Sequence, residues 1–390
     1  MKVLALGGAG AMGRVAARVV AGLPGVVDLV VADRDPEAAR RTAAALSAGT
    51  AVPVRAARVD VADTARLHEA LHRSDLVLNT VGPYYRYGVG VLRAAIRAGT
   101  HYLDLCDDWE PTAAMLDLDV EARAAGVCAL VGMGASPGIS NLLAARAAAR
   151  LDTLTDVYTA WPVDVGPHEG SPDGLSAAAV HWMQQIGGAV ATVEAGRIVH
   201  RPPLRPVALR LPGGRRGTAY TVGHPEPVTL RRTLRPGGAS AGLMVVTTGT
   251  AAFLDVLRRD LDAGRLTNET AAAQLDRPSP GRVLRAVALA PGMRGPGSLP
   301  GFFAAATGTR AGCPYTVLAE LAGAEKVLAD MAESTGVPAA LAAAQLIDGT
   351  AREPGVHPPE TAVDGDRFFA DLARHWPGVR VEVTEAPSGV

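Results

Sequence analysis

A glycine-rich loop near the N-terminus constrains the fold most strongly. A short apolar segment over residues 2–6 precedes the loop Gly8-Ala9-Gly10-Ala11-Met12-Gly13, and an alanine-rich segment of helical period follows it. Glycines at this spacing permit a tight turn, close approach of the backbone to a pyrophosphate and close packing of helix on strand, and the helix N-terminus favours phosphate charge. The order strand, loop, helix predicts a dinucleotide site formed by Gly8, Gly10, Ala11, Met12 and Gly13.

The first third of the chain alternates short apolar runs with segments of helical period, which is the pattern of βαβ units and a parallel sheet. We predict strands over residues 2–6, 27–32, 54–59, 76–80, 102–105 and 127–131, and helices over 11–23, 36–46, 64–72, 89–98 and 111–125. Six strands with crossover helices indicate an α/β fold, a doubly wound Rossmann domain, in which ligands lie outside the carboxyl ends of the strands.

The order changes after a predicted helix over 139–150. We expect antiparallel-looking strands over 155–163, 198–200, 207–211, 220–222 and 302–307, with a surface connection over 275–301, where Pro, Gly and Arg are frequent. Helices over 325–334, 338–346 and 366–375, a turn over 355–360 and a strand over 379–383 complete the chain. We therefore predict a Rossmann domain over 1–135, an inserted α+β mixed-sheet domain for substrate and dimerisation over 136–350, and a segment over 351–390 that returns to the first domain.

Composition excludes several classes of function. The net charge is −1 and hydrophobic residues make up 48% of the chain, so nothing in the overall charge favours nucleic acid. No apolar run reaches the roughly 20 residues that a membrane span needs, and we expect a cytoplasmic protein with a small-molecule substrate. The only lysines are Lys2 and Lys326, and neither is placed for Schiff-base chemistry. The three cysteines are far apart without metal-ligand spacing, so we expect no metal site.

Polar residues at the predicted strand ends are candidates to bind the cofactor. Asp33 follows the glycine loop by about twenty residues and can accept hydrogen bonds from ribose hydroxyls, which favours NAD; the adjacent Arg34 could instead hold the 2′-phosphate of NADP. Asp60 and Val61 are expected beside the adenine, with a helix cap as the alternative role of Asp60. The segment that ends the fourth strand is expected beside the nicotinamide ribose, through Asn79, Thr80, Gly82 and Pro83.

Several segments together resemble one family. These are the glycine loop, Asn79-Thr80-Val81-Gly82-Pro83-Tyr84, Ala98-Gly99-Thr100-His101-Tyr102-Leu103-Asp104, Gly134-Ala135-Ser136-Pro137-Gly138-Ile139 and Gly355-Val356-His357-Pro358-Pro359-Glu360. They resemble the saccharopine dehydrogenase-like reductases, a family that includes lysine 6-dehydrogenase, over about residues 1–145 and again over 336–376. The resemblance implies a Rossmann domain completed by C-terminal residues, an inserted mixed α/β domain, NAD(P)-dependent chemistry at a carbon–nitrogen bond of an amino acid or amine, and homodimers formed through the inserted domain.

The chain also departs from this family. Lysine-forming members use a catalytic lysine, and this chain has none in a suitable place, which excludes that branch. The middle region has motifs of its own, namely His168-Glu169-Gly170, Ala179-Val180-His181-Trp182 and Gly223-His224-Pro225-Glu226. The identity of the substrate therefore does not carry over from the resemblance.

Transfer of a hydride to or from an amine carbon needs a nearby proton donor or acceptor. Our candidates are Tyr84, Asp107 and His181, with aromatic packing, a helix cap and a structural histidine as the respective alternatives. Substrate contacts are predicted for residues at the ends of strands five and six and in the second domain. These are Tyr85, Asp104, Cys106, Ser136, Pro137, Gly138, Asn141, His224 and Glu226. Cys106 is expected to be a small packing residue rather than a nucleophile, because acidic neighbours disfavour its thiolate.

Three functional hypotheses follow. The first is an NAD(P)-dependent oxidoreductase that reduces an imine or oxidises an amine of an amino-acid-like substrate. The second is a reductase of a C=C or C=O bond in a polyketide or lipid-like substrate, which apolar lining of the second domain without acidic groups would favour. The third is a non-catalytic nucleotide-sensing protein.

Overall fold

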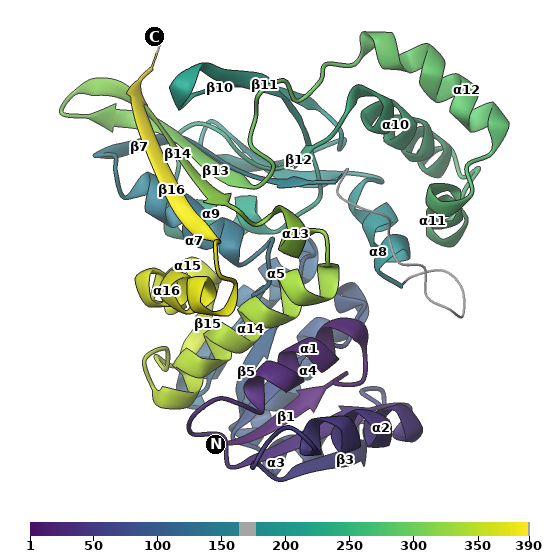
Figure 1. The fold of residues 1–390 in the computed structure, drawn as a ribbon, viewed down its shortest axis with the longest axis vertical. Coiled ribbons are helices and arrows are strands. Elements are labelled where there is room, and N and C mark those ends of the chain that lie inside the picture. The colour runs from purple at the N-terminus through teal and green to yellow at the C-terminus, as the bar shows by residue number, and fades with distance from the viewer. Residues whose placement is uncertain (164–176, 389–390) are drawn as a thin grey trace. The chain divides into compact units, whose positions relative to one another are not determined.

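The computed structural model describes residues 1–163 and 177–388, so the motif His168-Glu169-Gly170 lies outside the described residues. The chain forms two compact units (Figure 1). The first unit contains Met1–Leu142 and Lys326–Arg380, and the second contains Leu143–Glu325 and Val381–Val390. The sequence placed the boundaries at 135/136 and 350/351, whereas the chain passes between the units after residues 142, 325 and 380.

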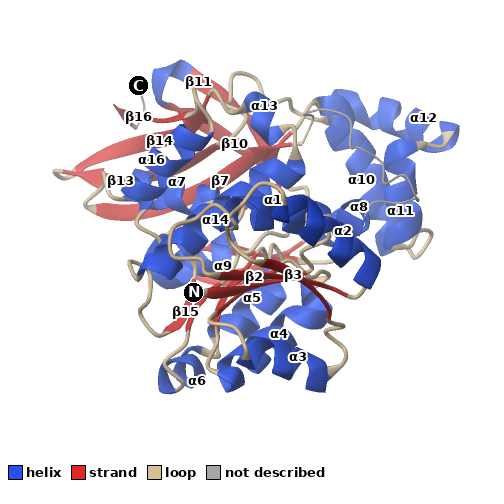
Figure 2. Ribbon diagram, turned by 60° about the horizontal axis from the view of Figure 1, so that its bottom comes forward, coloured by secondary structure: helices blue, strands red, loops and turns tan. Residues whose placement is uncertain are grey.

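The first unit is built on a parallel sheet of seven strands in the order β15-β6-β5-β4-β1-β2-β3, as far as the structure describes the chain. The strands are β1 (Lys2–Leu6), β2 (Asp28–Asp33), β3 (Val54–Arg58), β4 (Leu76–Asn79), β5 (His101–Asp104), β6 (Cys128–Leu130) and β15 (Gly355–His357). The helices are α1 (Ala11–Val20), α2 (Pro36–Ser47), α3 (Thr64–His72), α4 (Tyr84–Ala98), α5 (Trp109–Leu116), α6 (Asp119–Ala124), α14 (Met331–Asp348), α15 (Pro359–Ala362) and α16 (Gly365–His375). Figure 2 shows α3, α4, α5 and α6 on one face of this sheet and α1, α2 and α14 on the other. The predicted doubly wound α/β fold is confirmed.

The six predicted strands of this sheet are present within one or two residues of the predicted bounds, but β15 was not predicted. It has three residues and precedes Pro358 and Pro359, so its sequence resembles a turn. Its backbone pairs with Cys128–Leu130 of β6 in register. The C-terminal part of the chain therefore completes the sheet with a strand, not only with helices.

The second unit contains a mixed sheet of nine strands in the described part of the chain. Seven follow the order β10-β11-β12-β7-β13-β14-β16, and β8 pairs with β12 and β9. The strands are β7 (Thr153–Pro162), β8 (Val190–Glu194), β9 (Arg197–Arg201), β10 (Pro206–Leu211), β11 (Arg215–Thr221), β12 (Ser240–Val245), β13 (Phe303–Arg310), β14 (Cys313–Ala322) and β16 (Arg380–Pro387). Most neighbours are antiparallel, whereas β12 and β7 are parallel, which agrees with the predicted mixed α+β domain.

Two predictions for the second half of the chain were wrong. The strand expected over 379–383 to return to the first domain is β16, which lies beside β14 in the second sheet. The region over 275–301 is more than a surface connection, because it contains the helix α12 (Pro280–Leu289). This helix follows α10 (Thr248–Asp262) and α11 (Asn268–Asp276), and proline at its first helical position is compatible with helix initiation.

The remaining helices are α7 (Ile139–Ala148), α8 (Ala177–Gln185), α9 (Glu226–Thr233) and α13 (Glu325–Leu328). None of the helices in the described residues is long and apolar enough to cross a membrane.

Helices α1 and α14 lie side by side although they are far apart in the sequence (Figure 1). Gly336 makes this packing possible, because a Cβ atom there would lie 2.8 Å from the carbonyl oxygen of Met12 and 2.9 Å from the Cβ of Val15. Pro338 lies inside α14, yet the helix continues to Asp348. Close backbone approach to α1 therefore explains a glycine in the middle of a helix.

We expect Gly336→Ala to lower the free energy of unfolding by about 2 kcal/mol, because overpacking a tight contact typically costs 1–3 kcal/mol. Gly249→Ala in α10 is the matched control, since a Cβ atom there meets nothing within 4 Å. Alanine favours a helix over glycine by up to roughly 1 kcal/mol, so the control should be neutral or stabilising. Denaturant unfolding of both variants checks this, and equal effects would contradict the packing argument.

Candidate functional site

The glycine loop forms a tight turn between β1 and α1. The amide of Gly7 donates to the carbonyl oxygen of Ala32 at 2.8 Å, and the amide of Gly10 donates to the carbonyl oxygen of Gly7 at 3.0 Å. Gly7 has a φ of +75°, a conformation that glycine adopts without steric cost. The hydroxyl of Thr80 lies 3.0 Å from the carbonyl oxygens of both Leu6 and Gly7, so the end of β4 holds the turn in place.

The three predicted glycines differ in what they permit. A Cβ atom at Gly13 would lie 2.3 Å from the carbonyl oxygen of Gly7 and 2.7 Å from the hydroxyl oxygen of Thr80, and one at Gly8 would lie 2.7 Å from the carbonyl oxygen of Ala5. These two positions require glycine for packing. A Cβ atom at Gly10 would meet only the carbonyl oxygen of Gly7, at 3.3 Å, so Gly10 leaves open space beside the helix N-terminus.

This loop fits a pyrophosphate. Gly10 is the N-cap of α1 without a side-chain cap, and the first turn, which begins at Ala11 and Met12, contains no acidic residue. Amides of a first helical turn have no intrahelical partners and, with the helix dipole, attract an anion. The residues present are therefore suited to the phosphates of a dinucleotide.

The carboxyl ends of β2 and β3 present one acidic and two basic side chains. Oδ1 of Asp33 accepts a hydrogen bond from the amide of Asp35 at 3.1 Å, which fixes the direction of this half-buried carboxylate. Arg34 is exposed, and so is Arg58, which ends β3 directly opposite Asp33 in the sheet register. The sequence analysis missed Arg58, although its position at the end of the predicted third strand could have indicated it.

Asp60 and Val61 lie at the start of the loop that leads to α3. Oδ1 of Asp60 accepts from the amide of Ala62 at 2.9 Å, whereas the N-cap of α3 is Asp63, so Asp60 is not the helix cap. Val61 lines a cavity of about 330 Å³ between α3 and α4. The other lining residues are Ala62, Thr64, Leu67, His68, Arg86, Tyr87, Gly90, Val91, Ala94 and Arg97.

The side chain of Asn79 at the end of β4 is fully buried, which differs from the predicted contact with cofactor ribose. Its Nδ2 donates to the hydroxyl of Tyr102 at 3.0 Å, and its Oδ1 accepts from the amide of Val81 at 3.1 Å. Gly82 is exposed and Pro83, the N-cap of α4, is half-buried. Thr80 is half-buried too, but its hydroxyl is engaged by the carbonyl oxygens of Leu6 and Gly7.

The hydroxyl of Tyr84 belongs to a buried network rather than to an open site. Tyr84 is 7% exposed, and its hydroxyl donates to the carbonyl oxygen of Asn79 at 2.9 Å and accepts from the amide of Leu105 at 3.2 Å. Burial and the nearby Asp104 carboxylate raise the pKa of Tyr84 well above its usual value. These contacts agree with the alternative that the sequence left open, a packed aromatic residue, and not with a proton donor to substrate.

Asp104 is also fully buried and joins β5 to the loop after β6. Its Oδ2 accepts from the hydroxyl of Tyr102 at 2.7 Å, and its Oδ1 accepts from the amides of Gly132 at 2.7 Å and Cys106 at 3.1 Å. Burial raises the pKa of this carboxyl to about 6, against the lowering effect of its hydrogen bonds. All of these partners belong to the chain itself, which favours a structural role for Asp104 over the predicted contact with substrate.

The next residues of this segment divide between the interior and the surface. Cys106 is fully buried, its Sγ accepts from the hydroxyl of Thr112 at 3.4 Å, and burial raises the pKa of its thiol well above the usual value. Asp108, not Asp107, is the N-cap of α5. Asp107 is half-buried, so it remains the carboxylate of this segment that a ligand could reach; Tyr85, on α4, is 55% exposed.

The Ser136-Pro137-Gly138 segment forms a tight loop at the start of α7. The amide of Gly138 donates to Oδ1 of Asn141 at 3.0 Å, and Nδ2 of Asn141 donates to Glu360 at 2.8 Å. Asn141 is fully buried, Pro137 and Gly138 are buried, and Ser136 is half-buried. Asn141 thus holds the loop and the C-terminal segment together, and Ser136 is the predicted substrate contact that the loop leaves accessible.

In the second unit, the predicted residues His224 and Glu226 share a buried cluster with Trp161 of β7. Nδ1 of His224 lies 3.5 Å from Oε2 of Glu226, and the two residues are 4% and 0% exposed. The ring of Trp161 stacks on that of His224 with centroids 5.3 Å apart and lies 6.5 Å from that of Trp182 on α8. On the same helix, Nε2 of His181 lies 3.4 Å from Nε2 of Gln185. The fold therefore brings the side chains of His224 and Glu226 together.

Sequence reasoning missed Trp161 and Gln185. The indole Nε1 of Trp161 is buried and has no hydrogen-bond partner among the described residues. A carboxylate, an imidazole and an indole in one buried cluster can recognise a cation, because the carboxylate supplies charge and the aromatic ring supplies a negative face. A tryptophan at the end of a strand in a chain with only four tryptophans was the available signal.

Residues 3–130 match the model of the saccharopine dehydrogenase NADP-binding domain family. Two curated relatives align over short segments. The chain is 46% identical over 46 residues to a trans-acting enoyl reductase of Mycobacterium ulcerans, and 43% identical over 49 residues to a saccharopine dehydrogenase-like oxidoreductase of Rattus norvegicus. These segments cover 12% and 13% of this chain and 11% of each relative.

The described fold is similar along its whole length to a solved structure. Saccharopine dehydrogenase (L-Glu forming) from Saccharomyces cerevisiae, in its apo form, superposes with a TM-score of 0.66 and 16% identity, and the match covers 99% of both chains. Residues 3–130 therefore match the saccharopine dehydrogenase NADP-binding domain family, and the chain as a whole has the fold of saccharopine dehydrogenase.

Proposed function

We propose that this protein transfers a hydride between a nicotinamide dinucleotide and a carbon–nitrogen bond of an amino-acid-like substrate, by imine reduction or amine oxidation. The observation that carries this proposal is the buried Glu226–His224 pair beside Trp161, in a chain whose first unit has a glycine loop shaped for a pyrophosphate. An ammonium or iminium group is the substrate group that a carboxylate and an indole ring favour together.

The cofactor would be held by groups at the carboxyl edge of the parallel sheet. The α1 N-terminus and Gly10 would bind the pyrophosphate, and Asp33 would accept hydrogen bonds from the adenosine ribose. When bound, the nicotinamide supplies or accepts the hydride. Asp33 favours NAD, whereas Arg34 and Arg58 are the two guanidinium groups that could hold a 2′-phosphate, so we propose NAD with NADP as the alternative.

The second unit would orient the substrate nitrogen and handle its proton. A histidine side chain can act as a general acid or base, and Glu226 at 3.5 Å can orient the ring of His224. His181 and Asp107 remain proposed as further groups near the substrate. Tyr84 is not included, because its hydroxyl is engaged with the backbone at Asn79 and Leu105.

The same cluster bears on the alternative of a C=C or C=O reductase for a polyketide or lipid-like substrate. That function would favour apolar lining without acidic groups, and a fully buried Glu226 beside His224 speaks against it. A non-catalytic sensor would bind the dinucleotide but turn over no substrate. A screen for NAD(P)H change at alkaline pH with lysine, saccharopine, ornithine and related amines, run beside enoyl and carbonyl substrates, separates the three. Turnover of an enoyl or carbonyl substrate alone, or of none, would contradict the proposal.

The cofactor preference can be tested with Asp33→Ala. We expect the Kd for NADH to rise about tenfold, the equivalent of 1.4 kcal/mol, and the Kd for NADPH to change less, because Asp33 bonds a hydroxyl that NADPH lacks. The double variant Arg34→Gln with Arg58→Gln should raise the Kd for NADPH more than the Kd for NADH. Fluorescence titration of each variant with both cofactors provides the measurement. An equal loss of affinity for NADH and NADPH in Asp33→Ala would refute the proposed preference for NAD.

Substitution of the buried pair tests the substrate role of the second unit. In Glu226→Gln and in His224→Gln we expect kcat/KM to fall by roughly a hundredfold or more, as for loss of an acid–base group, with the Kd for the dinucleotide unchanged. The pH profile of kcat should lose one limb in His224→Gln. His200→Gln, at a solvent-exposed position of β9, is the control. Unchanged turnover in both variants, with intact thermal unfolding, would remove the cluster from the mechanism.

Asp104 gives the folded protein a defined pH dependence. Because its pKa is raised to about 6 in the folded chain, the folded state holds this proton more tightly than the unfolded state does. The stability that the protonated carboxyl contributes is complete below about pH 4 and is lost as the pH rises through about 6. Relative to Asp104→Asn, the wild-type chain should lose about 3 kcal/mol of unfolding free energy over this range. Denaturant unfolding of both proteins at a series of pH values measures the difference, and a constant difference would contradict the raised pKa.

A further inference from the structure

Three buried polar atoms on β7 and β12 have no hydrogen-bond partner among the described residues. They are Oγ1 of Thr159, Nε1 of Trp161 and Oγ of Ser240. Thr159 and Ser240 are each 1% exposed. Buried polar groups of folded proteins nearly always have a partner, because an unpaired one lowers the stability of the fold. We call these three groups the free donor group, and its presence requires an explanation.

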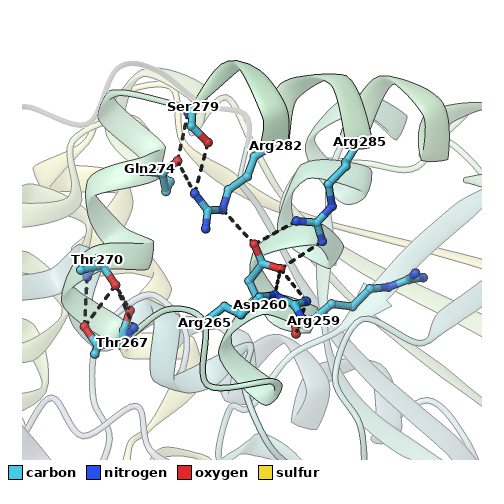
Figure 3. A network of polar contacts seen from close by, with 9 residues as sticks. All are labelled: Arg259, Asp260, Arg265, Thr267, Thr270, Gln274, Ser279, Arg282 and Arg285. Carbon is cyan, nitrogen blue, oxygen red and sulfur yellow. Dashed lines mark hydrogen bonds and ion pairs between the residues drawn. The ribbon is translucent and has the colours of Figure 1, made fainter.

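A buried carboxylate elsewhere in the second unit shows the usual arrangement. Asp260 of α10 is 1% exposed and accepts hydrogen bonds at 2.9–3.0 Å from three guanidinium groups (Figure 3), which belong to Arg265, Arg282 and Arg285. These bonds hold the pKa of Asp260 well below its usual range. The partners of Asp260 are thus supplied by the chain itself, whereas those of the free donor group are not.

The members of the free donor group lie on one face of the second sheet. Thr159 and Trp161 are two positions apart on β7, so their side chains leave the sheet on the same side. Gly242 of β12 is the partner of Thr159 in the parallel register. Ser240 is two positions before Gly242 and therefore shares this face as well.

The same face carries the proposed substrate cluster. A Cβ atom at Gly242 would lie 3.1 Å from Cβ of His224 and 3.8 Å from Oε2 of Glu226. Because Gly242 has no side chain, this pair lies directly on the sheet, beside the strand position of Thr159. The ring of Trp161 stacks on that of His224. The free donor group therefore belongs to the surroundings of the Glu226 carboxylate.

The neighbouring strands explain why the two hydroxyls stay unpaired. Thr159 lies between a glycine of β12 and Ala304 of β13, and neither has a polar side chain. Ser240 lies between Val157 of β7 and Val193 of β8. Valine or alanine would pack at both positions without an unpaired group. The hydroxyls are thus kept at a cost in stability, which proteins tolerate where function requires it.

The chemistry of the free donor group defines what satisfies it. The indole N–H of Trp161 donates only, and the two hydroxyls can donate as well, so the missing partner is an oxygen acceptor. A simple anion is disfavoured, because the Glu226 carboxylate lies on the same face. An acceptor on the molecule that also carries the cationic nitrogen avoids this repulsion. A carboxylate matches best, since its two oxygens can accept several hydrogen bonds.

We propose that Thr159, Trp161 and Ser240 determine substrate specificity by donating hydrogen bonds to a substrate oxygen, in the best case a carboxylate close to the reacting nitrogen. The inference rests on the proposed function in one respect, namely that Glu226 holds that nitrogen. Bound substrate pairs the three groups, whereas an amine without the oxygen leaves them unpaired. A site of this kind rejects the analogue that lacks the bonded group.

The stability of the ligand-free chain tests whether the hydroxyl of Thr159 is unpaired. Thr159→Val keeps the shape of the side chain and should raise the Tm by roughly 2 °C or more. Thr221→Val on β11 is the matched control, because Thr221 is 4% exposed and its Oγ1 accepts from the amide of Arg205 at 3.0 Å. This control should lower the Tm. A Tm of Thr159→Val that is unchanged or lower than that of the wild type would overturn the inference.

Calorimetric titration of the full chain with saturating NADH tests the specificity. The common L-amino acids, ornithine and saccharopine are the probes, and the tightest is compared with the amine that lacks only its carboxylate. We expect the amine to bind the wild type at least roughly a hundredfold more weakly. The double variant Thr159→Val with Ser240→Ala should bring the two Kd values within about tenfold of each other and leave the Kd for NADH unchanged.

The outcomes separate this inference from the proposed reaction. Binding with the expected preference but without any NAD(P)H change would contradict the reaction and still support the role of the free donor group. Equal binding of the amino acid and its amine to the wild type would overturn that role, even if both are turned over. The same holds if none of the probes binds, or if the double variant keeps the wild-type preference.

Discussion

The close approach of α1 to the end of β1 is the contact on which the candidate site depends. Gly13 allows it, since a Cβ atom there would lie 2.3 Å from the carbonyl oxygen of Gly7. Thr80 ties the same turn to β4, and Gly336 lets α14 pack against the outer side of α1. Contacts from three distant parts of the sequence therefore set the direction of the helix N-terminus and of the amides that face a ligand.

Two buried carboxylates organise the two units by opposite electrostatic means. Asp104 lies in a network of hydrogen bonds without a cation, so burial dominates and its pKa rises to about 6. Asp260 lies among three guanidinium groups, so its ionised form is favoured and its pKa falls. The first carboxylate joins β5 to the loop after β6, and the second joins α10 to α12. Each is a buried charge with an identified set of partners, and neither needs a ligand to explain it.

The sequence allowed the first sheet to be predicted because its strands and helices have clear periodicities and because Gly8, Gly10 and Gly13 occur in the required order. It could not show β15, which is stabilised by pairing with β6 rather than by its own residues. It also could not distinguish an accessible carboxylate from a buried one: Asp104 and Asp107 are three residues apart, yet only the latter remains accessible. The contact of Trp161 with His224 joins residues 63 positions apart, so spacing alone gave no sign of it.

We propose that this fold holds a nicotinamide dinucleotide at the N-terminus of α1. Titration of the full-length chain with NADH and with NADPH, followed by energy transfer from tryptophan to the reduced nicotinamide, measures it most directly. We predict saturable binding of at least one cofactor, with NADH the tighter, and competition by the matching oxidised form. Absence of energy transfer and of quenching with both cofactors would contradict the account.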